Sequence, residues 1–163
     1  MNKIILYGRR NTGMIALLYL KARGYNVVVA DDSDWLVRAV ASNLGVLVTN
    51  TDMELFTKTF DLFICVHGTR IFTPDELVVG KMVNIHPCLW KYKGKDPISR
   101  YIQNKDELGS VESHFIVKKV DAGDVICRTE FLTGVVKTHE EFYNTALPFY
   151  TTVIGDTLHK LGI

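Results

Sequence analysis

The sequence predicts an α/β fold: a Rossmann-like, doubly wound and mostly parallel sheet with helices on both faces. Short apolar runs rich in β-branched residues alternate, along the first part of the chain, with segments whose apolar positions recur at helical spacing. Glycines follow two of these helical segments, at Gly24 and Gly45, where helices commonly end. This βαβαβ alternation is typical of a parallel sheet whose crossover connections are helices.

The first part of the chain contains four expected strands and three expected helical segments. Gly8–Gly13 is expected to be a turn into the first helix, in which Met14, Leu17, Leu18 and Ala22 recur at helical spacing. The expected strands are 3–7, 26–30, 46–48 and 61–66, and the two later helical segments are 34–44 and 53–58.

The second part of the chain is expected to extend the same sheet. After Pro74, a short helical segment leads to a strand at 81–85, and Pro87 must end that strand because proline removes a ladder donor and fixes its own φ. Asp96-Pro97 is a helix-start signal, with a cap residue followed by proline in the first turn. The other expected elements are a helix from there to about Asn104 and strands at 110–117 and 125–131, on either side of a turn at 121–123.

The last helix is predicted by a capping box, in which Thr138 and Glu141 can satisfy each other's orphan backbone donors. It is expected to run toward His159, and Pro148 should kink it. The apolar residues expected on one face are Phe142, Ala146, Phe149 and Val153.

Composition predicts one soluble, cytoplasmic domain over residues 1–163. A net charge of +1 with scattered Lys and Arg gives no concentrated field for a nucleic acid. The apolar run at 4–6 is too short for a signal peptide core, and no run is long enough to span a membrane. The spacing of Cys65, Cys88 and Cys127 is not that of metal ligands, so no metal site is expected. The three cysteines are expected to be buried free thiols.

Three polar residues carry the chemistry expected of this chain. Side chains two apart on a strand share a face, so Asn84 and His86 are expected to point together into the crevice at a strand end, with Ile85 turned into the core. Asp121 follows about 35 residues after His86, in the turn between two strands. An amide, an imidazole and a carboxylate are the set needed to move an acyl group onto an amine.

The order of motifs between residues 61 and 131 resembles the folate-dependent formyltransferase family. The resemblance implies the formyltransferase fold, catalysis of formyl transfer to a primary amine, and 10-formyltetrahydrofolate as the donor. The motifs that carry it are Asn84-Ile85-His86-Pro87-Cys88-Leu89, Lys91-Tyr92-Lys93-Gly94, Pro97-Ile98, Gly109, His114-Phe115 and Val120-Asp121-Ala122-Gly123-Asp124-Val125-Ile126.

The resemblance also implies roles for the three polar residues. Asn84 would donate to the oxyanion of a tetrahedral intermediate. His86 would either stabilise that oxyanion as imidazolium or take the proton that leaves the amine, and Asp121 would raise the proton affinity of His86 or relay protons through water. The sequence leaves these alternatives open. His114 is expected to support the Asp121 loop more than to take part in catalysis, and Asp124 to be a solvated turn residue.

The same resemblance assigns the donor and acceptor sides of the site. Backbone around Arg70, Ile71 and Phe72 would form one wall against the pterin, and backbone from Val117 to Asp121, including Val120, the other. On the acceptor side, Gly8, Arg9 and Asn11 would hold a phosphate or diphosphate at a helix N-terminus, and Tyr92, Lys93 and Gly94 would form a pocket loop. The role of His67 is open.

The acceptor amine is the least determined part of the prediction. A tRNA formyltransferase is expected to carry a further basic domain after this one. A glycinamide ribonucleotide enzyme is expected to have an acidic residue five positions before the proline of the last helix. Tyr143 stands at that position here, although Glu140 and Glu141 are near it in sequence. A nucleotide-linked amino sugar is therefore the expected acceptor. A homodimer is compatible with the sequence. The alternatives are a non-catalytic Rossmann module, with Asp31 or Asp32 meeting the ribose of NAD, and a degenerate formyltransferase kept as a binding subunit.

Overall fold

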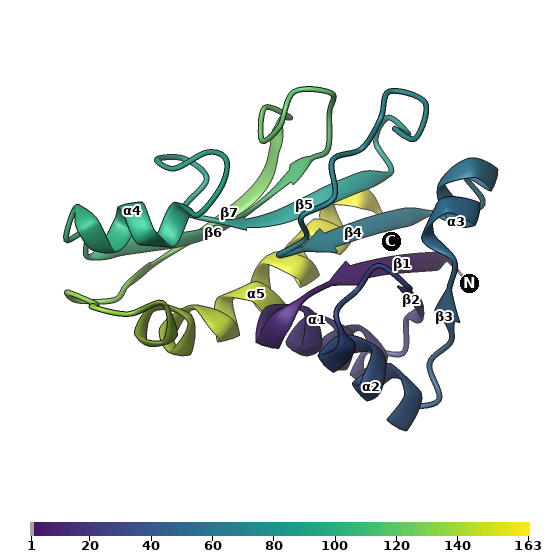
Figure 1. Ribbon diagram of the computed structural model, residues 1–163, viewed down its shortest axis with the longest axis horizontal. Helices are drawn as coiled ribbons and strands as arrows, with labels where there is room; N and C mark the ends of the chain where they lie inside the picture. The colour runs from purple at the N-terminus through teal and green to yellow at the C-terminus, as the bar shows by residue number, and fades with distance from the viewer. Residues whose placement is uncertain (1) are drawn as a thin grey trace.

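The computed structural model describes residues 2–163 and has one seven-stranded sheet at its centre (Figure 1). The strands are β1 (Lys3–Gly8), β2 (Asn26–Ala30), β3 (Val48–Thr49), β4 (Leu62–Val66), β5 (Met82–Pro87), β6 (Leu108–Phe115) and β7 (Val125–Leu132). Their order is β3-β2-β1-β4-β5-β6-β7. The first five strands in this order are parallel to one another, and β6 is antiparallel to both β5 and β7. The chain reverses its winding between β1 and β4, which is where doubly wound sheets open a ligand crevice.

Helices and an irregular loop cover the two faces of the sheet. Along β1, Ile4 and Leu6 belong to the larger core under α1, α2 and α5, whereas Ile5 and Tyr7 belong to a smaller core that includes Leu55 of α3. This alternation follows from the period of two along a strand. The predicted doubly wound α/β fold is confirmed, and Figure 1 shows the long α5 crossing beneath the sheet. The helices are α1 (Arg10–Ala22), α2 (Trp35–Asn43), α3 (Thr51–Thr57), α4 (Pro97–Gln103) and α5 (His139–Leu161).

Side-chain caps begin four of the five helices, as the sequence predicts for α4 and α5. At α4 the Asp96 carboxylate accepts from the Ser99 N–H, and Pro97 is the first helical residue. At α5 the Thr138 hydroxyl accepts from the Glu141 N–H at 3.1 Å. Glu141 in turn accepts from the N–H of Lys137, one residue before the cap, so the expected reciprocal box is shifted by one residue on that side.

Three local expectations about element bounds are wrong. No helix follows Pro74, where the segment is a turn. The third strand is Val48–Thr49 and not 46–48, because the Val46 N–H caps the preceding helix by donating to the Ala41 carbonyl. The helix after Gly8 begins at Arg10, well before the expected turn ends.

The buried face of α1 also differs from the expected one. Leu18 is 40% exposed, and Ala22 is exposed as well. Gly8 and Gly13 approach so closely that a Cβ on Gly13 would lie 2.6 Å from the Gly8 carbonyl carbon, and this contact sets the rotation of the helix on the sheet. The residues that α1 buries are Thr12, Gly13, Ala16, Leu17 and Leu20.

The three cysteines are buried free thiols, as expected. In α5, Phe142, Ala146 and Val153 are buried, and Phe149 stacks on Phe131 with ring centroids 4.4 Å apart. Within residues 2–163 the structure contains no helix with both the length and the apolar character needed to cross a membrane.

Candidate active site

A cleft of about 1010 Å³ opens at the carboxyl ends of β4 and β5. Its walls come from the segment after β4, from β5 itself, from residues 94–98, from the β6–β7 loop and from α5. Pockets of this size are typical of small-molecule sites. Among residues 2–163, no group of three or more histidine, cysteine, aspartate and glutamate side chains is arranged to hold a metal ion.

The strand register brings Asn84, His86 and His114 onto one face. Asn84 of β5 lies directly opposite His114 of β6, and a register irregularity at Ser113/His114 adjusts the aim of that histidine. The Asn84 Nδ2 and the His114 Nε2 are 3.2 Å apart. His86 lies two residues further along the same strand and is only 8% exposed. The sequence predicted the Asn84–His86 pair, and it predicted His114 as a support of the Asp121 loop more than as a catalytic residue.

Asp121 reaches this face from the loop between β6 and β7. Its Oδ2 lies 3.1 Å from the His86 Nε2, and its Oδ1 lies 3.5 Å from the His114 Nε2. The N–H of Gly94 donates to the same carboxylate at 2.7 Å. Asn84, His86 and Asp121 therefore meet in one place, as the sequence predicted, and Gly94 joins them through its backbone.

The hydrogen bonds of His86 place an acceptor at each ring nitrogen. Its Nδ1 lies 2.8 Å from the Pro87 carbonyl, which can only accept, and its Nε2 faces the Asp121 carboxylate. A neutral imidazole has one N–H, whereas an imidazolium has two. This arrangement therefore suits the doubly protonated ring.

Several contacts hold Asp121 in its ionised form. Burial by itself raises the pKa of this carboxyl, but the interactions with His114 and His86 and the Gly94 N–H outweigh it and hold the pKa well below its usual range. The backbone of Asp121 has a φ of 53°, in the left-handed region that aspartate tolerates better than most residues. Asp121 is thus a fixed negative charge beside His86, and Asp124 is exposed, as expected for a solvated turn residue.

The residues expected on the donor side all line the cleft. Arg70, Ile71 and Phe72 stand on one wall, and Val117 and Val120 on the other. Ile71 is 69% exposed, and Val117 and Val120 are 41% and 51% exposed. Apolar side chains left open on two facing walls are suited to a flat aromatic ligand.

The corner expected to bind a phosphate is already occupied by a side chain. The Arg10 N–H donates to the Asp34 carboxylate at 2.6 Å, and the Arg9 N–H donates to the Val66 carbonyl. Gly8 is buried, and its N–H is bonded to the Ser33 hydroxyl. The sequence suggested backbone donors open to a ligand, and a carboxylate from the next helix start takes that place.

Of the other residues expected on the acceptor side, only Gly94 lines the cleft. Tyr92 is 6% exposed, and its hydroxyl is hydrogen-bonded to Asp106 and Asn104, so its expected place in an acceptor pocket is wrong. Lys93 is exposed and does not line the cleft.

A second hollow of about 250 Å³ adjoins the cleft and contains Asn11. Asn11 and Thr12 from α1 line it, together with Glu140 of α5. The residues that line both spaces are Arg10, His67, His139 and Tyr143. In this region the sequence predicted Asn11 as an acceptor-side residue. It missed His139 and the contact between His67 and Tyr143, and Tyr143 was noted only for its position before the last-helix proline.

His67 lies at the junction of the two spaces, directly after β4. Its Nδ1 is 3.5 Å from the Tyr143 hydroxyl, and the ring centroids are 5.7 Å apart. Burial, together with the charges of Arg10 and Arg9, lowers the pKa of His67 to about 4. The ring is therefore neutral at physiological pH.

This partly buried, neutral histidine predicts a pH dependence of stability. The unfolded chain takes up a proton at an ordinary pKa of 6.5 and the folded chain only near 4, so folding is weakened as the pH falls between these values. In wild type, the free energy of unfolding should fall over this window by about 2 kcal/mol more than in His67→Asn, whose asparagine tolerates the φ of 59°. Urea unfolding at several pH values measures the difference. Parallel curves for the two proteins would show that His67 titrates normally.

The fold and this site together define the class of the protein as a Rossmann-like formyltransferase fold. A phosphoribosylglycinamide formyltransferase from Streptococcus pneumoniae has a TM-score of 0.82 and 22% identity, over 100% of both chains. An N-formyltransferase from Helicobacter canadensis, solved with folinic acid and dTDP-3-aminofucose, has a TM-score of 0.82 and 21% identity, over 99% of this chain and 64% of the other.

The chain belongs to the formyl transferase family, whose sequence pattern matches residues 33–154. The family expected from the sequence is thereby confirmed. Among curated relatives, the methionyl-tRNA formyltransferase of Borrelia turicatae is 30% identical over 138 residues, which cover 80% of this chain. The matched part is 45% of that relative, so the chain spans about half the length of the curated relatives it matches.

Proposed function

We propose that this protein is an N-formyltransferase that moves the formyl group of 10-formyltetrahydrofolate to the primary amine of a nucleotide-linked amino sugar. The observation that carries the proposal is the convergence of Asn84, His86 and Asp121 on one wall of the cleft. Apolar side chains on the two adjoining walls support a pterin-bearing donor. Two similar solved structures hold 5-N-formyl-THF or folinic acid, which supports the same donor class.

The chemistry follows from the donors and charges of the site. The acceptor nitrogen attacks the formyl carbon, a tetrahedral oxyanion forms, the C–N bond to the folate breaks, and the proton lost by the amine passes to the folate nitrogen. The Asn84 amide has two N–H groups; one can donate to His114, and the second is left for the oxyanion. Such a donor contributes about 3 kcal/mol in other enzymes. His86, held between Pro87 and Asp121, can stabilise this oxyanion as imidazolium or carry the amine proton to the folate nitrogen.

The acceptor side supports a sugar nucleotide. The hollow beyond the catalytic residues adds about 250 Å³, which extends the site beyond the reacting amine. Its junction with the cleft has the neutral ring of His67 against Tyr143, and burial raises the pKa of that phenol above its ordinary value. A neutral aromatic wall suits the face of a sugar ring, and Arg10 brings a guanidinium for a diphosphate.

Glycinamide ribonucleotide is the second candidate acceptor. Glu140 lies in the outer hollow beside Tyr143 and offers a carboxylate there, although not at the expected position. The similar phosphoribosylglycinamide formyltransferases also match this chain over most of their length, at 94% and 100%. Both observations keep this acceptor in the experiment described below.

A non-catalytic nucleotide-binding module is poorly supported by the carboxylates after β2. Asp31 accepts hydrogen bonds from the N–H and hydroxyl of Thr51, and Asp32 is paired with Arg70 at 2.5 Å. Each carboxylate already has partners in the protein, with which a ribose hydroxyl would have to compete. This alternative also does not explain why Asn84, His86 and Asp121 lie together in the cleft.

The experiment that tests the proposal is a mass-spectrometric acceptor screen. The full chain is incubated with 10-formyltetrahydrofolate and, separately, with nucleotide-linked amino sugars, glycinamide ribonucleotide and charged initiator tRNA. We expect a formyl mass on an amino sugar and stoichiometric release of tetrahydrofolate. Formylation of a different acceptor would overturn the sugar assignment alone, and donor binding without any transfer would overturn the proposed enzymatic activity.

A further inference from the structure

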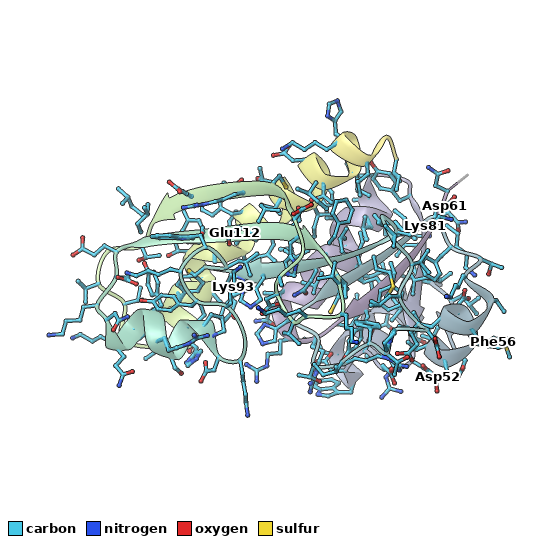
Figure 2. All side chains as sticks on the ribbon, turned by 90° about the horizontal axis from the view of Figure 1, so that it is seen from above. Asp52, Phe56, Asp61, Lys81, Lys93 and Glu112 are labelled. Atoms are coloured by element: carbon cyan, nitrogen blue, oxygen red, sulfur yellow. The ribbon has the colours of Figure 1, made fainter. Side chains whose placement is uncertain are left out.

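Arg70 lines the cleft, yet its guanidinium is bound to three carboxylates. Nη1 lies 2.5 Å from Asp32, and Nη2 lies 2.7 Å from Asp52 and 2.5 Å from Glu76. These carboxylates come from the end of β2, from α3 and from the irregular segment that follows Arg70 itself. Figure 2 shows Asp52 at the end of the molecule formed by α3. One side chain thus ties three separate segments together.

The segment that Arg70 holds is residues 67–81, which joins β4 to β5 without a helix or strand. Apart from Arg70, its cleft-facing part is held at two points, by Thr69, whose hydroxyl accepts from the Arg9 guanidinium, and by Phe72, which packs on the smaller core. The Thr69 N–H donates to the Tyr7 hydroxyl, and the Phe72 ring packs edge-on against Phe63 at 5.5 Å. Between these points lies Ile71, whose side chain is 69% exposed. The position of this wall therefore depends on Arg70.

The geometry of Arg70 differs from that of a surface ion pair. Its side chain is 20% exposed, and hydrogen bonds and charges from the three carboxylates raise its pKa, although burial opposes this. The Glu76 carboxylate is held a second time by the Thr73 N–H at 2.7 Å. A planar guanidinium can bond several carboxylates in fixed directions, which a lysine ammonium on a flexible stem cannot do. Without it, three negative charges would face one another across the segment.

We propose that Arg70 is a positioning residue that fixes the Ile71 and Phe72 wall of the donor site and does not itself bind the donor. This inference rests on the proposed folate-dependent function. Both Nη atoms already hold carboxylates, and only one N–H of Nη1 is left for any further acceptor. The remaining nitrogen, Nε, is buried and has no partner among the described residues, so it offers no open donor to the cleft.

Neutralising the carboxylates separates positioning from direct binding. If Arg70 positions the wall, Glu76→Gln removes one anchor of the segment and weakens donor binding. If Arg70 binds the donor, the same substitution frees the guanidinium and strengthens binding or leaves it unchanged. Asp52→Asn is the matched control, because Asp52 is 78% exposed and an exposed pair contributes little.

The experiment measures binding of 5-formyltetrahydrofolate, a stable analogue of the donor, to the full chain by calorimetry. We expect the Kd to rise about tenfold in Arg70→Met, less in Arg70→Lys and about threefold in Glu76→Gln, with Asp52→Asn within about twofold of wild type. At saturating donor, kcat should stay within about twofold in Glu76→Gln and Asp52→Asn, because neither residue touches the reacting atoms.

The outcomes distinguish this inference from the proposed function. If wild type binds no folate, both are overturned. If wild type binds and Arg70→Met binds equally well, or Glu76→Gln binds more tightly, only the positioning role is overturned. If Arg70→Met does not fold, the conservative Glu76→Gln variant decides between the two roles by the direction of its Kd change.

Discussion

Replacing His86 by alanine is expected to lower kcat by about 10²- to 10⁴-fold, the range found for lost acid–base groups. The imidazole lies between the Pro87 carbonyl and the Asp121 carboxylate, and no other described group bridges these two acceptors. In the mechanism we propose, its loss leaves the oxyanion with the Asn84 amide alone. Turnover at saturating donor measures the effect, and the Kd for 5-formyltetrahydrofolate should change little because His86 is not on the donor walls.

Two further variants make this result interpretable. His159→Ala removes an exposed histidine at the far end of α5 and should leave kcat unchanged. His86→Gln keeps one hydrogen-bond donor and loses the charge. If the imidazolium charge matters, this variant should be nearly as slow as His86→Ala. Wild-type kcat in His86→Ala would remove this residue from the mechanism.

Among substitutions in the site that add one methyl group, Gly123→Ala is expected to lower the stability of the protein most. A Cβ at this position would lie 1.8 Å from the Phe115 carbonyl oxygen, a backbone atom that cannot rotate away. The same turn is closed by the Phe115 N–H, which donates to the Asp124 carbonyl. Overpacking of this kind costs about 1–3 kcal/mol or more. We expect the free energy of unfolding to fall by that amount in urea titrations.

The same substitution should also reduce activity, because Asp121 is two residues away on the loop that must move. The expected result is a kcat lowered by about tenfold or more even where the protein is fully folded, since small displacements of catalytic groups are costly. Ala122→Ser changes the neighbouring exposed residue and should match wild type in both measurements. A Gly123→Ala protein with unchanged stability would show that the loop relaxes freely.

Much of the fold follows from local pattern. The β-branched runs predicted β1, β2, β4 and β5 within about two residues, and the Asp96-Pro97 signal placed the start of α4. The elements that failed were those in which a hydrogen bond or ion pair outside the expected element held the segment instead. Val46 caps a helix instead of extending a strand, and the turn near Glu76 is held by Arg70.

The site divides in the same way. The two-residue spacing of Asn84 and His86 on a strand determined that both would face one cleft. The addition of His114 depended on the antiparallel register of β5 and β6, which local pattern does not specify. The burial of Tyr92 depended on Asp106 and Asn104, which lie on the far side of α4 in sequence.

By itself, the sequence determined the strand rhythm, the family and the trio of Asn84, His86 and Asp121, because each rests on residues near one another or on motifs in fixed order. Only the tertiary structure decided that Asp34 fills the expected phosphate corner, that His67 meets Tyr143, and that Arg70 is bound to three carboxylates. The physical reason is that a side chain's partners are set by which segments fill the same space, and these partners are 6 to 76 residues apart in the chain.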